Sequence, residues 1–535
     1  MRRLSTWFLG LAFGLTQVAS ADVVTDWNNQ LCESVRAERT NPPRACRFMA
    51  MVQVAVYDAV NGVLGGFEPY YVEGQALGAD PSAAAAAAAH RVLVNIYPTR
   101  ASIFDAALAA SLAGIPDGQA KDFGVAWGEY CADQILALRA NDNSDLVVPY
   151  TVSGEIGRWE PTPPAFTPSP LLPNWPLVTP WAMARGSQFR SPPPPALTSQ
   201  EYTEAYNEVK EVGRVDSTTR TPDQSEIALF WADGAGTATP PGHWNLIAQG
   251  ISAQEGLSLQ ENARLFALIG IAVADSAIVS WDNKYFYDHW RPVSGIRKGD
   301  LDGNPNTEAD PTWSSFVVTP PFSSFTSGHS TFSSSSSKIL EQFFGTDDIA
   351  FTTGPDVGVA VAPRSFSSFS SAADEAGKSR IYGGIHWEYD NYRALFGGRS
   401  LGRLVFNNYL RPLGDLSLRL NQTLFGGTGG TMVLRARLEP AQPGQQVDAY
   451  VALQTPGDAL LFLQADGSLS SDPLPLAENV RTGSFDAPIF NIALSDGEDI
   501  PVGTYIWKAA LTEHGKLQLA SNIATVAFNI NPFSE

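Results

Sequence analysis

Lys284-Tyr-Phe-Tyr-Asp-His-Trp-Arg-Pro292 is the stretch that decides the fold of this chain. Two later segments complete it, Ser327-Gly-His329 and Ser379-Arg-Ile-Tyr-Gly-Gly-Ile-His386. Arginine can grip two oxygens of an anion at once, lysine supplies a point charge, and N–H groups at a helix start add further donors. The three segments together therefore predict a site that holds one tetrahedral oxyanion.

The bulk composition sharpens this prediction. The chain has 535 residues and a formal net charge of -20, so a cluster of positive groups must be built against the overall field. The acidic balance argues against a nucleic-acid partner and gives no support for binding an anionic membrane surface. A hydrophobic content of 44% and an aromatic content of 11% are typical of a folded protein. The length predicts two or more domains.

The first 21 residues have the pattern of a signal peptide. Arg2 and Arg3 precede a short apolar run at 7–15, and Ala19-Ser-Ala21 supplies small residues for cleavage. The apolar run is too short to span a membrane, so we expect no transmembrane segment and a secreted or periplasmic protein that begins near Asp22.

The chain has three cysteines, Cys32, Cys46 and Cys131, none in a paired metal spacing. In an exported protein Cys32 and Cys46 could form a disulfide, which would leave Cys131 buried and free.

Residues 22–415 are predicted to form a helical domain in two halves, joined by a proline-rich crossing at 160–195. An alanine-rich run at 83–97 is expected to be a closely packed helix interface. The other predicted helices are 48–64, 103–112, 123–138, 199–212, 222–231, 243–254, 260–287, 331–344, 372–387 and 398–409.

A glycine-rich joint at 426–430 separates this part from residues 431–535, where apolar residues alternate with a period of two. Runs near 447–453, 460–463, 505–509 and 524–530 predict strands, and their number suggests an immunoglobulin-like β-sandwich. Its His514 and Asp466 are expected at the surface or in turns. The predicted fold class is mainly α, a helical bundle followed by a small all-β sandwich domain.

The pattern also predicts where the oxyanion ligands lie. Lys284 lies near the end of the long helix, and Pro292 is expected to stop that helix, with Arg291 at its exit. Ser327 and Gly328 precede a helix and offer N–H groups at its start. His386 follows Arg380 by six residues, nearly two turns along the same predicted helix.

Lys-x6-Arg-Pro, then Ser-Gly-His, then Ser-Arg-x5-His resembles the signature shared by vanadium-dependent haloperoxidases and type 2 phosphatidic acid phosphatase-like acid phosphatases. The resemblance implies an α-helical fold and a vanadate cofactor. It implies that the oxygens are held by Lys284, Arg291, Ser327, Gly328 and Arg380. His386 would bond the vanadium, or attack phosphorus in a phosphatase, and His329 would be the acid–base group.

Other segments resemble the bacterial chloroperoxidase-like branch, among them Phe230-Trp-Ala-Asp-Gly234 and Thr239-Pro-Pro-Gly-His-Trp-Asn245. Trp281 and Phe322 match aromatic positions that line the halide side, although ordinary core packing would also explain them. Asp233 is expected to orient Arg380 or His329 from behind. His243 and His289 are expected to be structural, and Asp300-Leu-Asp-Gly-Asn304 to be a turn rather than a calcium loop.

The resemblance implies an enzyme that oxidises halide with hydrogen peroxide to hypohalous acid, with Lys284 polarising the bound peroxide. Whether a small organic substrate follows is left open. One alternative is a phosphomonoesterase with a phosphohistidine intermediate at His386. A second is a non-catalytic anion-binding or surface-attached protein that works through its β-domain.

Overall fold

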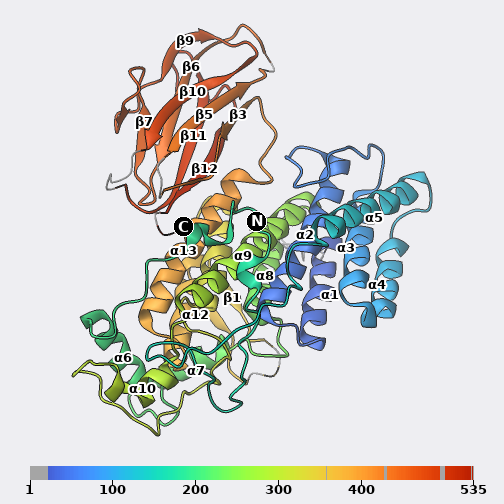
Figure 1. Cartoon of the computed structure of the whole chain (residues 1–535). Helices are drawn as coiled ribbons and strands as arrows, with labels where there is room; N and C mark the ends of the chain where they lie inside the picture. Colours follow the sequence, from blue (N-terminus) through green and yellow to red (C-terminus); the bar gives the residue numbers. More distant parts are fainter. Residues whose placement is uncertain are drawn as a thin grey trace, which may run out of the picture.

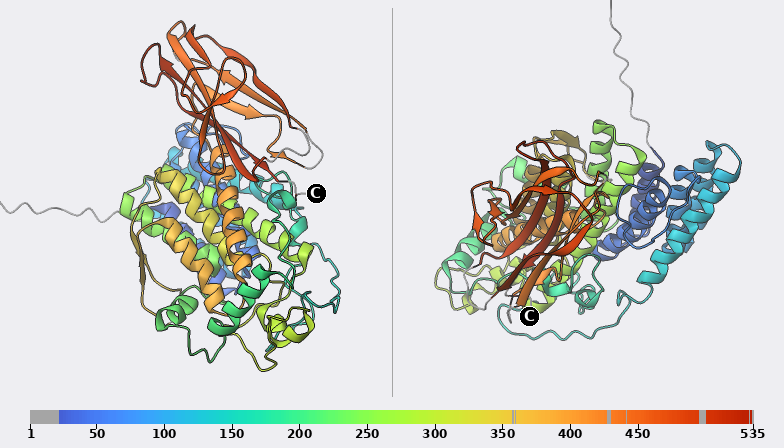
Figure 2. Two further views of the ribbon diagram at one scale, coloured as in Figure 1. Left: turned by 90° about the vertical axis from the view of Figure 1, so that its left-hand side faces the viewer. Right: turned by 90° about the horizontal axis from the view of Figure 1, so that it is seen from above.

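The fold is known from a computed structural model that describes residues 22–533, except residues 357, 359, 427–429, 441, 495–499 and 532. The expected signal peptide lies outside the described residues. All the described α-helices lie between residues 23 and 408, and the strands β3 to β12 follow from residue 416. Figures 1 and 2 show the β-rich part at one end of the helical part, where its strand β12 packs against α13.

The first helical group, shown in blue in Figure 1, contains α1 (Val23–Ala37), α2 (Pro42–Leu64), α3 (Pro81–Ile96), α4 (Ala101–Ala113) and α5 (Gln119–Arg139). Side-chain caps start most of its helices, because Asp22, Asn41 and Asp80 each accept a backbone N–H of the first turn. All seven alanines from Ala83 to Ala89 are buried. A side chain at Gly124 or Gly128 of α5 would meet the backbone of α3, so the alanine run is the close interface that the sequence predicts.

The second helical group follows the proline-rich crossing, where the described chain forms no α-helix between α5 and α6. Its members are α6 (Gln200–Val212), α7 (Pro222–Phe230), α8 (Thr239–Glu255), α9 (Leu259–Tyr287), α10 (Pro292–Arg297), α11 (Gly328–Phe344), α12 (Phe369–Tyr382) and α13 (Glu388–Asn408). Short 3₁₀ turns lie at Pro98–Arg100, Trp175–Leu177, Gly186–Phe189 and Gly299–Leu301 (η1–η4), and a small hairpin pairs β1 (Phe351–Thr353) with β2 (Arg364–Phe366).

The long helix α9 forms the centre of the core. A capping box of Ser258 and Glu261 starts it, and every residue from Asn262 to Lys284 is buried. It is the one helix among the described residues that is long and apolar enough to cross a membrane, and its apolar window is wholly buried inside the protein. Burial of this kind is what the core helix of a helical bundle requires.

Three predicted positions near the helix ends were wrong. The helix α9 ends at Tyr287, where Asp288 adopts a left-handed conformation with φ 49°, so Arg291 precedes α10 instead of closing α9. The helix α12 ends at Tyr382, because Gly383 and Gly384 follow and Gly384 has φ 75°. His386 therefore lies on a loop, and α13 begins at Glu388, ten residues before its predicted start.

The β-rich part consists of two sheets. One has the order β10-β5-β3, and the other β4-β12-β11-β6-β7-β8, with β9 paired to β6. The strands are β3 (Leu416–Leu420), β4 (Leu424–Phe425), β5 (Gly430–Leu438), β6 (Gln446–Gln454), β7 (Leu460–Leu463), β8 (Leu469–Ser470), β9 (Ala477–Arg481), β10 (Phe485–Leu494), β11 (Gly503–Glu513) and β12 (Ala524–Ile530). Both sheets contribute to one hydrophobic cluster, and strand structure begins at Leu416, before the glycine-rich joint.

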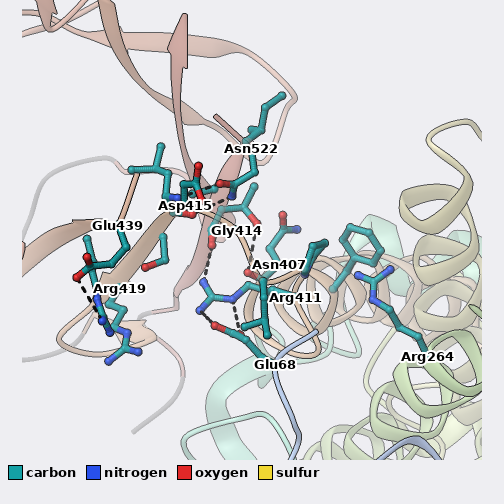
Figure 3. A pocket seen from close by; sticks show the side chains of 18 residues that line it. Glu68, Arg264, Asn407, Arg411, Gly414, Asp415, Arg419, Glu439 and Asn522 are labelled. Carbon is teal, nitrogen blue, oxygen red and sulfur yellow. Dashed lines mark hydrogen bonds and ion pairs between the residues drawn. The ribbon is translucent and has the colours of Figure 1, made fainter. Parts of the chain in front are cut away.

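The seam between the two parts is held by Arg411. Its guanidinium pairs with both carboxylate oxygens of Glu68 at 2.8 and 2.9 Å, and also donates to the carbonyls of Leu418 and Thr525. Figure 3 shows Arg411 and Glu68 among the residues that line a pocket at the seam. The pocket has a volume of about 580 Å³. Arg411 thus connects the loop that follows α2 with the strands β3 and β12 of the β-rich part.

All three cysteines are buried free thiols, so the expected disulfide between Cys32 and Cys46 is absent from the structure. Both side chains lie inside the first helical group, on α1 and α2, where burial raises their thiol pKa values. They behave here as small apolar residues of a packed core.

Candidate active site

The three sequence segments converge on one buried site. Lys284 comes from the last turn of α9, Arg291 from the start of α10, and Arg380 from the last turn of α12. Ser327 caps α11, and Gly328 and His329 are its first residues. We call the set Lys284, Arg291, Ser327, Gly328, His329, Arg380 and His386 the oxyanion cage.

His386 is the most closely defined member of the cage. Its Nδ1 lies 2.8 Å from Asp390 Oδ2, and its Nε2 lies 3.0 Å from Arg291 Nη1. With Asp390 as acceptor the proton stays on Nδ1, so Nε2 keeps its lone pair. Burial holds the pKa of His386 well below its ordinary value, and the charge of Arg291 lowers it further. A neutral imidazole with its lone pair on Nε2 can bond a metal centre or attack phosphorus once Arg291 Nη1 donates to the bound anion instead.

Each of the two cage arginines has a buried N–H donor without a hydrogen-bond partner. Arg291 donates to the carbonyls of Phe322 and Ile385, yet its buried Nη2 has no hydrogen-bond partner. Arg380 donates through Nη1 to the Trp231 carbonyl at 2.9 Å, while its buried Nε has none. Burial lowers the pKa of Arg291 to about 9 and that of Arg380 to about 10. A bound anion would satisfy both groups, because it offers oxygens and negative charge together.

Lys284 is held differently from the arginines. Its Nζ donates to the carbonyls of Ser323, Ser324 and Thr326 at 3.0, 2.9 and 2.6 Å. An ammonium group has three N–H donors, so these contacts use all of them. In this arrangement Lys284 acts on an anion through its charge, and a direct hydrogen bond needs one carbonyl contact to be released.

The start of α11 supplies backbone donors and a histidine. Ser327 accepts the Ser330 N–H at 3.3 Å and thereby caps the helix. His329 is half-buried, its buried Nε2 has no hydrogen-bond partner, and desolvation followed by the charge of Arg380 holds its pKa well below the ordinary value. A neutral His329 can accept a proton from a ligand beside it.

A cavity of about 350 Å³ opens onto the cage. Its lining includes Gly328, His329, Arg380 and His386, together with Trp281 and Phe322. The two aromatic rings lie 5.0 Å apart, and Phe322 packs 4.9 Å from the Arg291 guanidinium and 5.2 Å from Lys284 Nζ. Both aromatics therefore line the cavity, while Lys284, Arg291 and Ser327 lie fully buried behind it.

Asp233 lines the same cavity, but its hydrogen-bond partner differs from the expected ones. The two oxygens of its carboxylate lie 3.2 and 3.3 Å from His243 Nδ1, and among the described residues it makes no hydrogen bond to Arg380 or His329. Its charge still acts on Arg380, whose pKa it raises against the effect of burial. The influence on the cage is thus electrostatic, and the direct contact is with His243.

Asp390 is the site residue that the sequence interpretation missed. It accepts the Trp387 N–H at 3.1 Å as well as the His386 proton, and burial raises its pKa to about 7 although Lys284 opposes the rise. The spacing of four residues between His386 and Asp390 was available in the sequence as a signal. Its meaning depended on a helix starting at Glu388, which was not predicted.

The remaining predicted residues have structural contacts. His289 Nε2 lies 2.7 Å from the Tyr389 hydroxyl, and Asp302 accepts from the Asn304 N–H and the Thr307 hydroxyl within a turn. In the β-rich part His514 contacts Asp448, and Asp466 accepts the Ser468 N–H. Among the described residues no three His, Cys, Asp or Glu side chains gather as a metal-binding group.

Vanadate fits the cage by this chemistry. It is a tetrahedral oxyanion, and the buried atoms without partners at Arg291, Arg380 and His329 are nitrogen atoms suited to its oxygens. The Nε2 lone pair of His386 supplies the single metal ligand that an oxyanion of this kind needs. Phosphate fits the same donors for the same reason.

Comparison with known proteins finds similarity to vanadium chloroperoxidases. Residues 264–415 match the family model of the second helical-bundle domain of vanadium chloroperoxidase. The chain is 26% identical over 473 residues to a vanadium chloroperoxidase of Curvularia inaequalis, covering 68% of this chain and 77% of the relative.

Solved structures give the same result for the fold. A bacterial vanadium-dependent iodoperoxidase superposes with a TM-score of 0.65 at 27% identity, over 72% of this chain and 95% of the other. A holo-type bacterial vanadium-dependent chloroperoxidase superposes with a TM-score of 0.55 at 15% identity, over 73% of this chain and 93% of the other. By its cage segments and these matches, the chain is similar to vanadium-dependent haloperoxidases in sequence and in fold.

Proposed function

We propose that this protein is a vanadate-dependent haloperoxidase that uses hydrogen peroxide to oxidise a halide to hypohalous acid. The observation that carries the proposal is the set of buried, unpartnered donor atoms of Arg291 and Arg380 around a neutral His386. Two similar proteins are named as a chloroperoxidase and an iodoperoxidase, which supports the same reaction class.

The cage residues divide the work as follows. Arg291 and Arg380 bind and orient the oxyanion, and Gly328 and Ser327 add donors at the start of α11. His386 Nε2 is the anchoring ligand, fixed in place by Asp390. When bound, vanadate supplies a Lewis-acid centre that activates hydrogen peroxide towards halide.

The other residues handle protons, charge and access. His329, neutral at its low pKa, accepts a proton from the incoming peroxide through Nε2. Lys284 adds positive charge where negative charge develops on the reacting oxygen. Trp281 and Phe322 form the apolar wall of the cavity beside these groups, which makes them the halide-facing side in this proposal.

The same cage also suits a phosphomonoesterase, because the His386–Asp390 pair would serve a nucleophilic histidine equally well. One assay separates the two functions. Protein stripped of oxyanion is supplied with orthovanadate, then tested with peroxide and iodide, bromide or chloride, and in parallel with a phosphate ester. Vanadate-dependent halide oxidation supports the haloperoxidase, whereas ester turnover without halide oxidation would assign the protein to the phosphatases.

Three expectations complete the proposal. The protein is secreted or periplasmic, on the evidence of residues 1–21, and N-terminal sequencing of exported protein should begin near Asp22. The catalytic domain spans residues 22–415. The two C-terminal sheets form an immunoglobulin-like sandwich, in support of which both contribute residues to one hydrophobic cluster.

A further inference from the structure

His243 and Asp233 form a buried pair beside the oxyanion cage that the proposed reaction does not use. The two side chains are 2% and 5% exposed, and His243 Nδ1 lies 3.2 Å from the nearer carboxylate oxygen. Asp233 lies on the loop between α7 and α8, and His243 lies near the start of α8. The imidazole packs against the rings of Trp231 and Phe230, with centroids 4.8 and 5.5 Å away.

The pair is connected to the cage through one arginine. Asp233 lines the same cavity as Arg380 and His329, and its charge acts on Arg380. Arg380 also donates to the carbonyl of Trp231, the residue whose ring packs on His243. Since Arg380 has no carboxylate in ion-pair contact among the described residues, Asp233 is the acidic group that most directly opposes its positive charge.

The protonation state of His243 decides how much of the negative charge of Asp233 acts on Arg380. The charged groups that act on His243 are Asp233, and Asp356 from the segment after β1; Asp356 is itself paired to Arg36 of α1 at 2.8 Å. Burial lowers the pKa of His243, but Asp233 and then Asp356 more than offset this, so the pKa lies above its ordinary value. A protonated His243 neutralises Asp233, whereas a neutral His243 leaves a carboxylate charge facing Arg380.

We propose that His243 is a positioning residue that sets the strength of the oxyanion cage through Asp233: its protonation frees the charge of Arg380 for the anion. The proposal takes the cage as the oxyanion site and so rests on the proposed function, but it concerns binding and not halide chemistry. One added charge near a buried arginine is worth on the order of tenfold in anion affinity. Because such coupling is reciprocal, anion binding then raises the pKa of His243 by about one unit.

The test uses tungstate, an oxyanion that stays doubly charged over the range used and needs no peroxide or halide. Its affinity for the full chain is measured by calorimetry between about pH 6 and 9, a range in which histidine responds to its surroundings. His329 and His386 have low pKa values and remain neutral there. Asp390 and Arg291, with pKa values of about 7 and about 9, titrate in the wild type and in the variants alike, so the difference between the wild type and a His243 variant isolates the effect of His243. For the wild-type protein we expect affinity to rise about tenfold as pH falls through the pKa of His243.

Two variants are expected to move in opposite directions. His243→Gln keeps a neutral donor next to Asp233 and should fix the affinity at its weaker, alkaline value. Asp233→Asn removes the opposing charge and should fix it at its stronger, acidic value. His90→Gln breaks a histidine–aspartate pair of the same kind outside the cage, 2.8 Å from Asp105, and should leave the profile unchanged.

A purely structural role gives a different pattern. Equal loss of tungstate affinity in His243→Gln and Asp233→Asn would overturn the proposal. An unchanged pH dependence of the affinity in His243→Gln would also overturn it. If a variant fails to fold, the wild-type protein still decides, because nitrogen-15 NMR of its histidines should show the His243 pKa rising when tungstate is added. An unmoved His243 pKa refutes the coupling even if halide oxidation is confirmed, and a moved one supports it even if halide oxidation is absent.

Discussion

At the scale of single residues, the site depends on which atom of His386 carries the proton. Asp390 holds the proton on Nδ1, and Arg291 Nη1 approaches Nε2 from the other side. The residue types of the cage could be predicted from the sequence, because each type and its spacing has a chemical meaning. The partners Asp390 and His243 could not be assigned in the same way, since their roles depend on helix starts and on a fold that brings the loop between α7 and α8 to the same cavity as Arg380.

Replacing Asp390 tests this proton assignment. In Asp390→Asn the amide can donate to Nδ1, which forces the proton onto Nε2 and removes the ligand lone pair. We expect turnover to fall by about 10²-fold or more with little change in the melting temperature, by analogy with other histidine–aspartate pairs. Asp282→Asn, which disturbs an ion pair with Arg190 outside the cage, is the matched control. Equal activity in the two variants would refute the assignment.

The buried imidazole of His289 should account for part of the loss of folding stability at acidic pH. Burial lowers its pKa to about 3, so between about pH 6.5 and 3 the unfolded chain binds a proton that the folded chain does not. Stability from this residue is therefore lost as pH falls, at about 1.4 kcal/mol per pH unit. His289→Gln should show a shallower loss of stability on acidification than the wild type, as measured by denaturant unfolding at several pH values. A parallel loss in both proteins would contradict this origin.

At the scale of elements, the ends of α12 and α13 decide where His386 lies. The apolar pattern continues past residue 382 and predicted a helix to residue 387, whereas the chain turns at Gly383 and Gly384. This turn releases His386 from α12 and places it before the capping of α13. Gly383 and Gly384 were the sequence signal that α12 ends there. The helical spacing of apolar residues on both sides of the pair indicated a continuous helix instead.

The close packing of α3 on α5 predicts that adding one methyl group at Gly128 destabilises the fold. A side chain at Gly128 would meet the carbonyl of Ala84, so Gly128→Ala should cost about 1–3 kcal/mol of unfolding free energy through overpacking. Gly114→Ala is the control, because a side chain there meets nothing within 4 Å. Thermal melting should separate the two variants, and equal melting temperatures would mean that α3 and α5 are less tightly packed than the structure shows.

At the scale of the whole molecule, the β-rich part is attached to the helical part through contacts that no local pattern reveals. Arg411 joins Glu68, 343 residues away in sequence, to carbonyls of two β-rich segments. Strand alternation predicted β6, β7, β11 and β12. It did not predict β3 and β4, which come before the glycine-rich joint, or the long strands β5 and β10. The seam itself follows only from the folded structure (Figure 3).

Removing Arg411 should loosen this seam. Arg411→Ala leaves Glu68 and two carbonyls without their donor, so we expect the β-rich part to become more sensitive to proteolysis and to melt before the helical part. Arg435→Ala breaks an exposed ion pair with Asp486 inside the β-rich part and serves as the control. A single, unshifted transition in Arg411→Ala would show that the apolar contacts of α13 and β12 suffice.

The central claim is that one oxyanion held by His386 is the working cofactor, and a titration of activity tests it most directly. Protein stripped of oxyanion is titrated with orthovanadate while the initial rate of halide oxidation by peroxide is recorded for the wild type and for His386→Ala. The wild-type rate should rise from near zero and saturate at one vanadate per chain, while the variant, correctly folded by circular dichroism, should stay flat. A wild-type rate independent of vanadate, or equal saturation in His386→Ala, would contradict the account.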